Sequence, residues 1–194
     1  MLASGRQAAR RASGAESIPP ELLGRAWCRL GEKSWPSLAD DEGERALRKG
    51  IALADDAGCH RVSVLGRWDL VRRLYTATDL APSWQLVDEA MKIAQAHLPE
   101  LVPLVNGLAT RLHALAGDLD QAEGLGRRVL RSWQRLGHRD GEANAQYTLG
   151  YLALQRADYH QAELGFLAAI EALDETGQGP ALFVLLGIVA MERG

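Results

Sequence analysis

The chain has 194 residues, of which 47% are hydrophobic and 24% charged, and its net charge is −3. This composition is typical of a globular protein with a core, and it lacks the basic excess of proteins that bind nucleic acids directly. The two cysteines, Cys28 and Cys59, fit no zinc-site spacing and cannot form a disulfide framework. We therefore expect a cytoplasmic protein with two reduced thiols.

The first segment of the chain, residues 1–18, is dominated by small and polar residues and has no apolar stretch of the kind found in secretory signals. It predicts a disordered tail. No apolar run approaches the roughly 20 residues that a membrane-spanning helix needs. The longest run, residues 181–191, is too short, so we expect no membrane insertion.

From residue 19 onward the sequence repeats itself. The small residues Gly43, Ser83, Ala122 and Ala162 recur at spacings of 40, 39 and 40 residues. The same register aligns other small residues with small ones and apolar residues with apolar ones. Self-similarity at a fixed period is the sequence signature of a repeat array.

Each repeat predicts a pair of helices, because apolar residues fall at helical spacing, as in Leu101, Leu104 and Leu108. No segment shows the sustained alternation expected of strands. The predicted hairpins cover residues 19–58, 59–98, 99–138 and 139–177, and a last helix covers residues 180–193. The fold class is therefore all-α, a right-handed α-solenoid of about four hairpins plus one C-terminal helix.

The turns inside the hairpins contain residues that favour tight reversals. In the third hairpin the turn is Gly117-Asp118, and in the fourth it is Ala157-Asp158. The aspartate in each is placed to cap the helix that follows.

Small residues predict where the two helices of a hairpin cross closely, because a large side chain there would push the backbones apart. Larger residues next to them, Leu30, Leu149 and Phe166, would fill the adjacent holes. The small residues at the predicted crossings are Gly31, Ala122, Gly150 and Ala162.

This pattern resembles the tetratricopeptide repeat. The W-x2-L-G signature of the first helix and the A…F…A signature of the second helix are present as Trp27, Leu30 and Gly31, and as Ala162, Phe166 and Ala169. The period of about 40, rather than the usual 34, and the missing helix-terminal proline depart from the family. A longer period is similar to that of helical sensor arrays in LuxR-type transcriptional regulators and STAND ATPases.

A search for catalytic chemistry finds none. The five histidines are scattered, no spacing matches a metal site, and no serine, threonine or cysteine lies in a nucleophile motif. Gly124-Leu125-Gly126 lies inside a predicted helix and does not follow a strand, so it predicts no phosphate loop. We expect no enzyme, no cofactor and no metal.

Recognition is the function that the resemblance implies, since the first helices of such hairpins line a concave groove that binds a protein or peptide. Trp, Tyr and Arg often dominate the energy of such contacts. The alternative is that the aromatic residues pack between repeats and the arginines are solvated or paired with carboxylates. The predicted groove residues are Arg25, Cys28, Glu32, Trp68, Arg72, Tyr75, Arg111, Asn144, Tyr147, Tyr151 and Gln155.

The predicted last helix, residues 180–193, is apolar around most of its circumference. A terminal cap normally has a polar outer face. Three possibilities stay open at this point: a solitary cap, an array that continues, or a homodimer that covers the apolar face. The leading functional hypothesis is a non-catalytic interaction scaffold, and the alternative is the signal-sensing part of a bacterial regulator.

Overall fold

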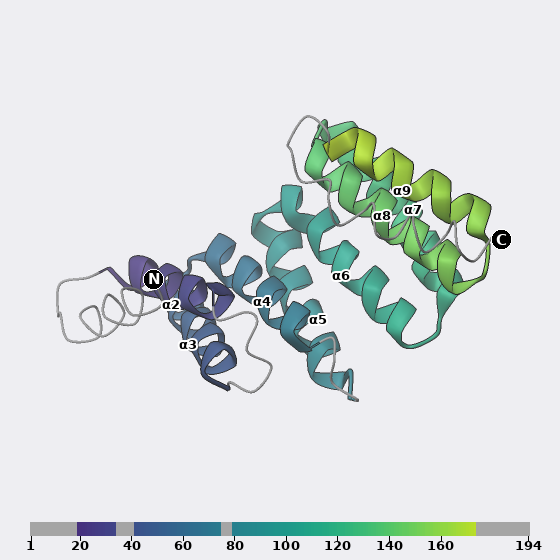
Figure 1. Ribbon diagram of the computed structural model, residues 1–194. Coiled ribbons are helices and arrows are strands. Elements are labelled where there is room, and N and C mark those ends of the chain that lie inside the picture. The colour runs from purple at the N-terminus through teal and green to yellow at the C-terminus, as the bar shows by residue number, and fades with distance from the viewer. Residues whose placement is uncertain (1–18, 34–40, 75–78, 174–194) are drawn as a thin grey trace. The chain divides into compact units, whose positions relative to one another are not determined.

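The computed structural model describes residues 19–33, 41–74 and 79–173 (Figure 1). Within these ranges the chain is helical and has no strand, which confirms the all-α prediction. The predicted tail, residues 1–18, and the predicted last helix, residues 180–193, lie outside the described residues. The helices are α2 (Pro20–Lys33), α3 (Asp41–Asp56), α4 (His60–Leu74), α5 (Ala81–His97), the short 3-10 helix η1 (Pro99–Leu101), α6 (Val102–Leu115), α7 (Leu119–Leu136), α8 (Arg139–Gln155) and α9 (Tyr159–Leu173).

The described residues form two compact units, which divide between Val105 and Asn106. In the first unit α2 packs on α3 and α4 packs on α5, and in the second α8 packs on α9. Successive hairpins also pack on each other inside a unit, α3 on α4 and α7 on α8. This is the stacking of an α-solenoid. None of the described helices is long and apolar enough to cross a membrane.

In the first unit, glycines let α2 approach α3 and α4. A Cβ atom on Gly50 would lie 2.6 Å from Sγ of Cys28 and 2.9 Å from the carbonyl oxygen of Gly24. A Cβ on Gly66 would lie 2.9 Å from the same sulfur atom. Cys28 is consequently buried between α2, α3 and α4, and its sulfur atom lies close to the backbone of α3 and α4 at Gly50 and Gly66.

In the second unit the fourth hairpin closes around Phe166, which is fully buried with Ala162 and Ala169. A Cβ on Gly150 would lie 2.9 Å from the Phe166 ring, and a Cβ on Gly165 only 2.7 Å from Cα of Gly150. The predicted close crossing of α8 and α9 at small residues is therefore confirmed.

Two hairpin turns share a left-handed residue at the same place. Gly117 has a φ of 80° and Ala157 a φ of 58°. In both turns the next amide, of Asp118 or Asp158, donates a hydrogen bond to a carbonyl in the last turn of the preceding helix, at 2.9 Å. Glycine adopts this conformation without strain, whereas alanine does not.

The predicted aspartate caps have different outcomes. Asp158 accepts a hydrogen bond from the Gln161 amide at 3.1 Å, as expected of a cap. The prediction for Asp118 was wrong, because its side chain makes no capping hydrogen bond to α7. Its carboxylate lies 3.3 Å from Nδ1 of His113 instead, in the last turn of the preceding helix α6.

Candidate functional site

The second unit brings together predicted groove residues from two successive first helices. Arg111 on α6 donates a hydrogen bond from Nη2 to Oδ1 of Asn144 on α8, at 2.9 Å. The two residues are 33 positions apart in the sequence. They therefore join the first helices of the third and fourth hairpins into one polar surface.

The other predicted groove residues of α8 lie on the same side of that helix as Asn144. Asn144, Tyr147, Tyr151 and Gln155 are spaced by three and four residues, which places them in one row along a helix. Tyr151 is 41% exposed, and Asn144 and Gln155 are exposed as well. We call the surface formed by Arg111 and these four residues the first-helix face.

Tyr147 has two roles in this arrangement. Its ring lies 6.0 Å from the ring of Phe166, tilted by 44°, and it packs against the buried cluster of the fourth hairpin. The side chain is half-buried. Tyr147 therefore contributes to the core, as expected if the aromatic residues pack between helices. Its packing also anchors the face of α8 on which Tyr151 lies.

In the first unit the structure brings Trp68 and Arg72 together. The guanidinium carbon of Arg72 lies 4.4 Å from the centre of the Trp68 ring, and Nη1 lies 3.9 Å from a carboxylate oxygen of Asp69. A cation over an aromatic face is a stabilising contact within one helix. The third residue predicted from this hairpin, Tyr75, lies outside the described residues.

Of the three residues predicted from the first hairpin, Arg25 is exposed on α2. The prediction for Cys28 was wrong, because Gly50 and Gly66 admit α3 and α4 close to its sulfur atom and cover it. Burial is the largest of the causes that raise the pKa of the Cys28 thiol to about 11, and the nearby carboxylates of Asp69 and Asp55 contribute the rest. The side chain of Glu32 lies outside the described part of the chain.

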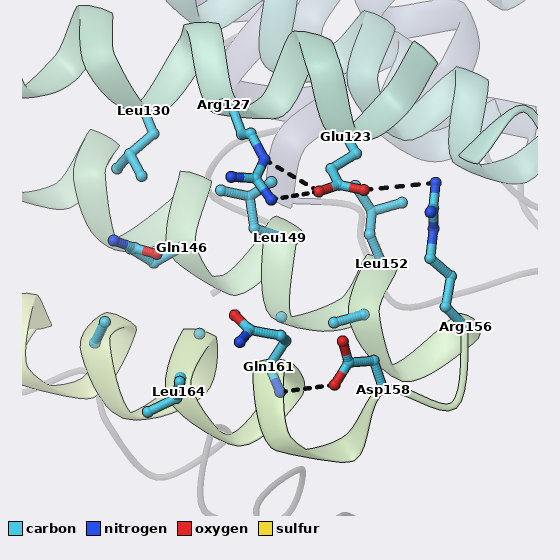
Figure 2. Close-up of a pocket in the computed structure, with 14 residues that line it drawn as sticks. Glu123, Arg127, Leu130, Gln146, Leu149, Leu152, Arg156, Asp158, Gln161 and Leu164 are labelled. Atoms are coloured by element: carbon cyan, nitrogen blue, oxygen red, sulfur yellow. Dashed lines mark hydrogen bonds and ion pairs between the residues drawn. The ribbon is translucent and has the colours of Figure 1, made fainter. Parts of the chain in front are cut away.

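A groove that the sequence did not indicate lies on the opposite side of α8 (Figure 2). Its volume is about 620 Å³ and it runs between α7, α8 and α9. Its apolar surface comes mainly from leucines and glycines of the three helices, namely Leu130, Leu149, Gly150, Leu152, Leu164 and Gly165.

Three of the charged side chains that line this groove, Glu123, Arg127 and Arg156, are paired with one another. Figure 2 shows Glu123 between two arginines: it accepts hydrogen bonds from Arg127 at 2.5 and 3.0 Å and lies 3.5 Å from Arg156. Arg156 also binds Asp120 at 2.5 Å. These ion pairs join α7 to the end of α8. The remaining charged residue of the lining, Asp158, accepts a hydrogen bond from the backbone amide of Gln161.

The most connected polar cluster of the first unit was also missed by sequence reasoning. The Arg67 side chain is 8% exposed, and its Nε atom lies 3.0 Å from Glu89 on α5. Its two terminal nitrogens lie 2.8 and 3.1 Å from the two carboxylate oxygens of Asp55 on α3. Ser63 donates a hydrogen bond to Asp55 at 2.5 Å and accepts one from Arg67 at 2.5 Å.

This cluster changes the ionisation of its members. Partial burial alone would raise the pKa of Asp55, but hydrogen bonds from Arg67 and Ser63 and the positive charge of Arg67 outweigh it and lower that pKa below its ordinary value of 3.8. Burial alone would lower the pKa of Arg67, but its two carboxylate partners raise it. Both groups are therefore held in their charged forms, as a structural clamp of α3, α4 and α5 needs.

Among the residues that the structure describes, no group of three or more histidine, cysteine, aspartate or glutamate side chains could hold a metal ion. No protein-family model and no curated protein sequence matches the chain. The structure resembles the crystal structure of BtubC (BKLC) from P. vanneervenii, with a TM-score of 0.72 and 18% sequence identity over 100% of this chain and 83% of that chain. At this identity the similarity shows a shared helical fold.

Proposed function

We propose that the chain is a non-catalytic scaffold of the tetratricopeptide type, which binds a segment of a partner protein on the first-helix face. The observation that carries this proposal is the Arg111–Asn144 hydrogen bond. It joins the first helices of two consecutive hairpins. Tyr151 and Gln155 lie farther along the same face of α8, about two and three turns beyond Asn144.

The chemistry of this face suits a peptide backbone. The guanidinium of Arg111 and the amides of Asn144 and Gln155 offer donors and acceptors that match main-chain carbonyl and N–H groups. Tyr151 adds a large exposed ring with a polar tip, the kind of side chain that supplies much of the binding energy in protein interfaces. The ligand is accordingly a protein segment, and catalysis has no part in the proposal.

The experiment is a selection from a phage-displayed library of random peptides against the purified chain. We compare wild type with the double variant Arg111→Glu/Tyr151→Ala. A matched control, Arg45→Glu/Leu167→Ala, makes the same kinds of change at an exposed arginine and an exposed leucine elsewhere. Selected peptides should lose at least about tenfold in affinity for the double variant, because each of the two residues contributes on the order of 1 kcal/mol. They should keep their affinity for the control.

Equal affinity for wild type and the double variant would remove the first-helix face as the binding surface. Failure to select any peptide that binds above background would count against the scaffold function itself.

The period of about 40 supports a second candidate, in which this array is the signal-sensing part of a LuxR-type regulator or a STAND ATPase. A helix-turn-helix or P-loop domain encoded in the same reading frame would support that candidate. We also propose a cytoplasmic location and a homodimer through residues 180–193. Light scattering across a concentration series, with and without those residues, tests the dimer.

A further inference from the structure

Arginines gather in the second half of α7 without carboxylates. Residues 124–136 contain four arginines and no aspartate or glutamate, in a chain whose net charge is −3. Charged residues three or four positions apart on a helix are neighbours, and like charges there are destabilising. Arg128, Arg131 and Arg135 have this spacing, so the helix carries a local electrostatic cost.

Among the described residues, Arg127, the neighbour of Arg128 on the same helix, has a carboxylate partner that the other three arginines lack. Arg127 has Glu123 four residues before it and binds it at 2.5 Å. The position four residues before Arg128 is Gly124, and the positions four residues before Arg131 and Arg135 are themselves arginines. These three exposed arginines form no ion pair within the described part of the chain.

The same three arginines line a pocket of about 740 Å³ with Asn106, Ser132 and Gln134. Ser132 holds part of this lining in place: its hydroxyl donates to the Arg128 carbonyl oxygen at 3.0 Å and accepts from Nη2 of Arg135 at 3.3 Å. None of the six lining residues is acidic. The pocket therefore presents guanidinium and amide donors to an anionic ligand.

We propose that this arginine pocket binds an acidic segment of a partner protein. The backbone positions of Arg128 and Arg135 are separated by a helix rise of about 10 Å. This span is too long for a single phosphate to contact all three arginines where their side chains leave the helix. An extended peptide with a carboxylate on every second residue places successive carboxylates about 7 Å apart on one side. Flexible arginines can follow that spacing. The pocket is a second site, on residues separate from the first-helix face.

The test measures fluorescence anisotropy with a labelled peptide of alternating serine and glutamate, and with the same peptide carrying glutamine for glutamate. The variant Arg128→Gln/Arg131→Gln/Arg135→Gln removes the cluster. The matched control Arg29→Gln/Arg45→Gln/Lys92→Gln removes the same charge at exposed positions of the first unit. Thermal unfolding of both variants establishes that they fold.

We expect the glutamate peptide to bind wild type and the control equally. The arginine-pocket variant should bind it at least about tenfold more weakly, and rising salt should weaken the wild-type complex. Arg111→Glu/Tyr151→Ala should leave it unchanged, which separates this site from the proposed function. Equal loss in the control, equal binding of the glutamine peptide, or competition by inorganic phosphate as strong as by the peptide would overturn the proposal. So would tighter binding of a single-stranded oligonucleotide that depends on the same arginines.

Discussion

Arg67 and Asp55 join α4 to the end of α3 through two parallel contacts, at 2.8 and 3.1 Å, and the Arg67 side chain is only 8% exposed. A bidentate arginine–carboxylate pair fixes both distance and orientation. With Glu89 on the other side of the guanidinium, Arg67 connects three helices of the first unit.

Replacing Asp55 with asparagine should destabilise the chain by about 1 to 3 kcal/mol, because Arg67 would be left buried with one carboxylate partner instead of two. Urea unfolding at neutral pH measures this. The control is Asp56→Asn, which changes the adjacent exposed carboxylate and should alter stability by less than about 0.5 kcal/mol. Similar losses in the two variants would mean that the Asp55 pair contributes nothing specific.

The same pair predicts a pH dependence. The pKa of Asp55 is lower in the folded chain than its ordinary value of 3.8, so the unfolded chain takes up a proton first as the pH falls. The stability that Asp55 contributes is present above pH 3.8 and is lost as the pH drops through the lowered folded pKa. Urea unfolding from about pH 6 to about pH 3 should show the difference between wild type and Asp55→Asn shrinking. A difference that stays constant over this range contradicts the lowered pKa.

Gly165→Ala should destabilise the second unit by about 2 kcal/mol despite the better helix propensity of alanine, because the new methyl group would lie 2.7 Å from the Gly150 backbone. The matched substitution is Gly107→Ala on α6, where the added Cβ would lie within 4 Å of nothing except its own helix. That variant should be more stable by roughly 0.5 to 1 kcal/mol. Chemical denaturation compares the two, and a neutral Gly165→Ala would argue against the close crossing of α8 and α9.

Exchanging alanine and glycine at the two left-handed turn positions, 157 and 117, should change the free energy of unfolding in opposite directions. Ala157→Gly should stabilise the chain by about 1 kcal/mol, since glycine has no Cβ penalty at a φ of 58°. Gly117→Ala should cost a similar amount, since its φ is 80°. Thermal unfolding of both variants measures the signs, and a loss of stability in Ala157→Gly would contradict the turn geometry.

The two cysteines should react very differently with iodoacetamide in the folded chain. Cys28 is buried and its pKa is raised to about 11, so the reactive thiolate is scarce near pH 8. Cys59 is less buried and should be alkylated first. Mass spectrometry of tryptic peptides follows both sites, with urea-unfolded protein as the control in which the rates converge. Equal rates in the folded chain would place Cys28 at the surface.

The fold class could be predicted because its determinants are local or periodic. Small residues recur at the helix crossings, and the packing of Phe166 against Gly150 and Ala162 follows from their place in the repeat. The site was harder to predict. Helical spacing gives the side of a helix on which Cys28 lies, but it does not reveal that Gly50 and Gly66 admit two other helices there.

The polar contacts could not be predicted for a related reason. The two carboxylate partners of Arg67 are 12 and 22 positions away, Asp120 is 36 positions from Arg156, and Asn144 is 33 positions from Arg111. Nothing in the local sequence distinguishes an arginine with such partners from one without. The run of arginines on α7 is the exception, since its lack of nearby carboxylates is visible in the sequence itself.

The central claim is that the first-helix face binds a protein segment, and site-specific photo-crosslinking tests it most directly. A photoreactive phenylalanine analogue is placed at Tyr151, at Gln155 or, as the control on another surface, at the 47% exposed Leu167. Each protein is irradiated in lysate of the source organism, and crosslinked peptides are mapped by mass spectrometry. We expect one segment of one partner to crosslink from both Tyr151 and Gln155, but not from Leu167, and to disappear in Arg111→Glu. Unrelated peptides from all three positions, or a crosslink that survives Arg111→Glu unchanged, would contradict the account.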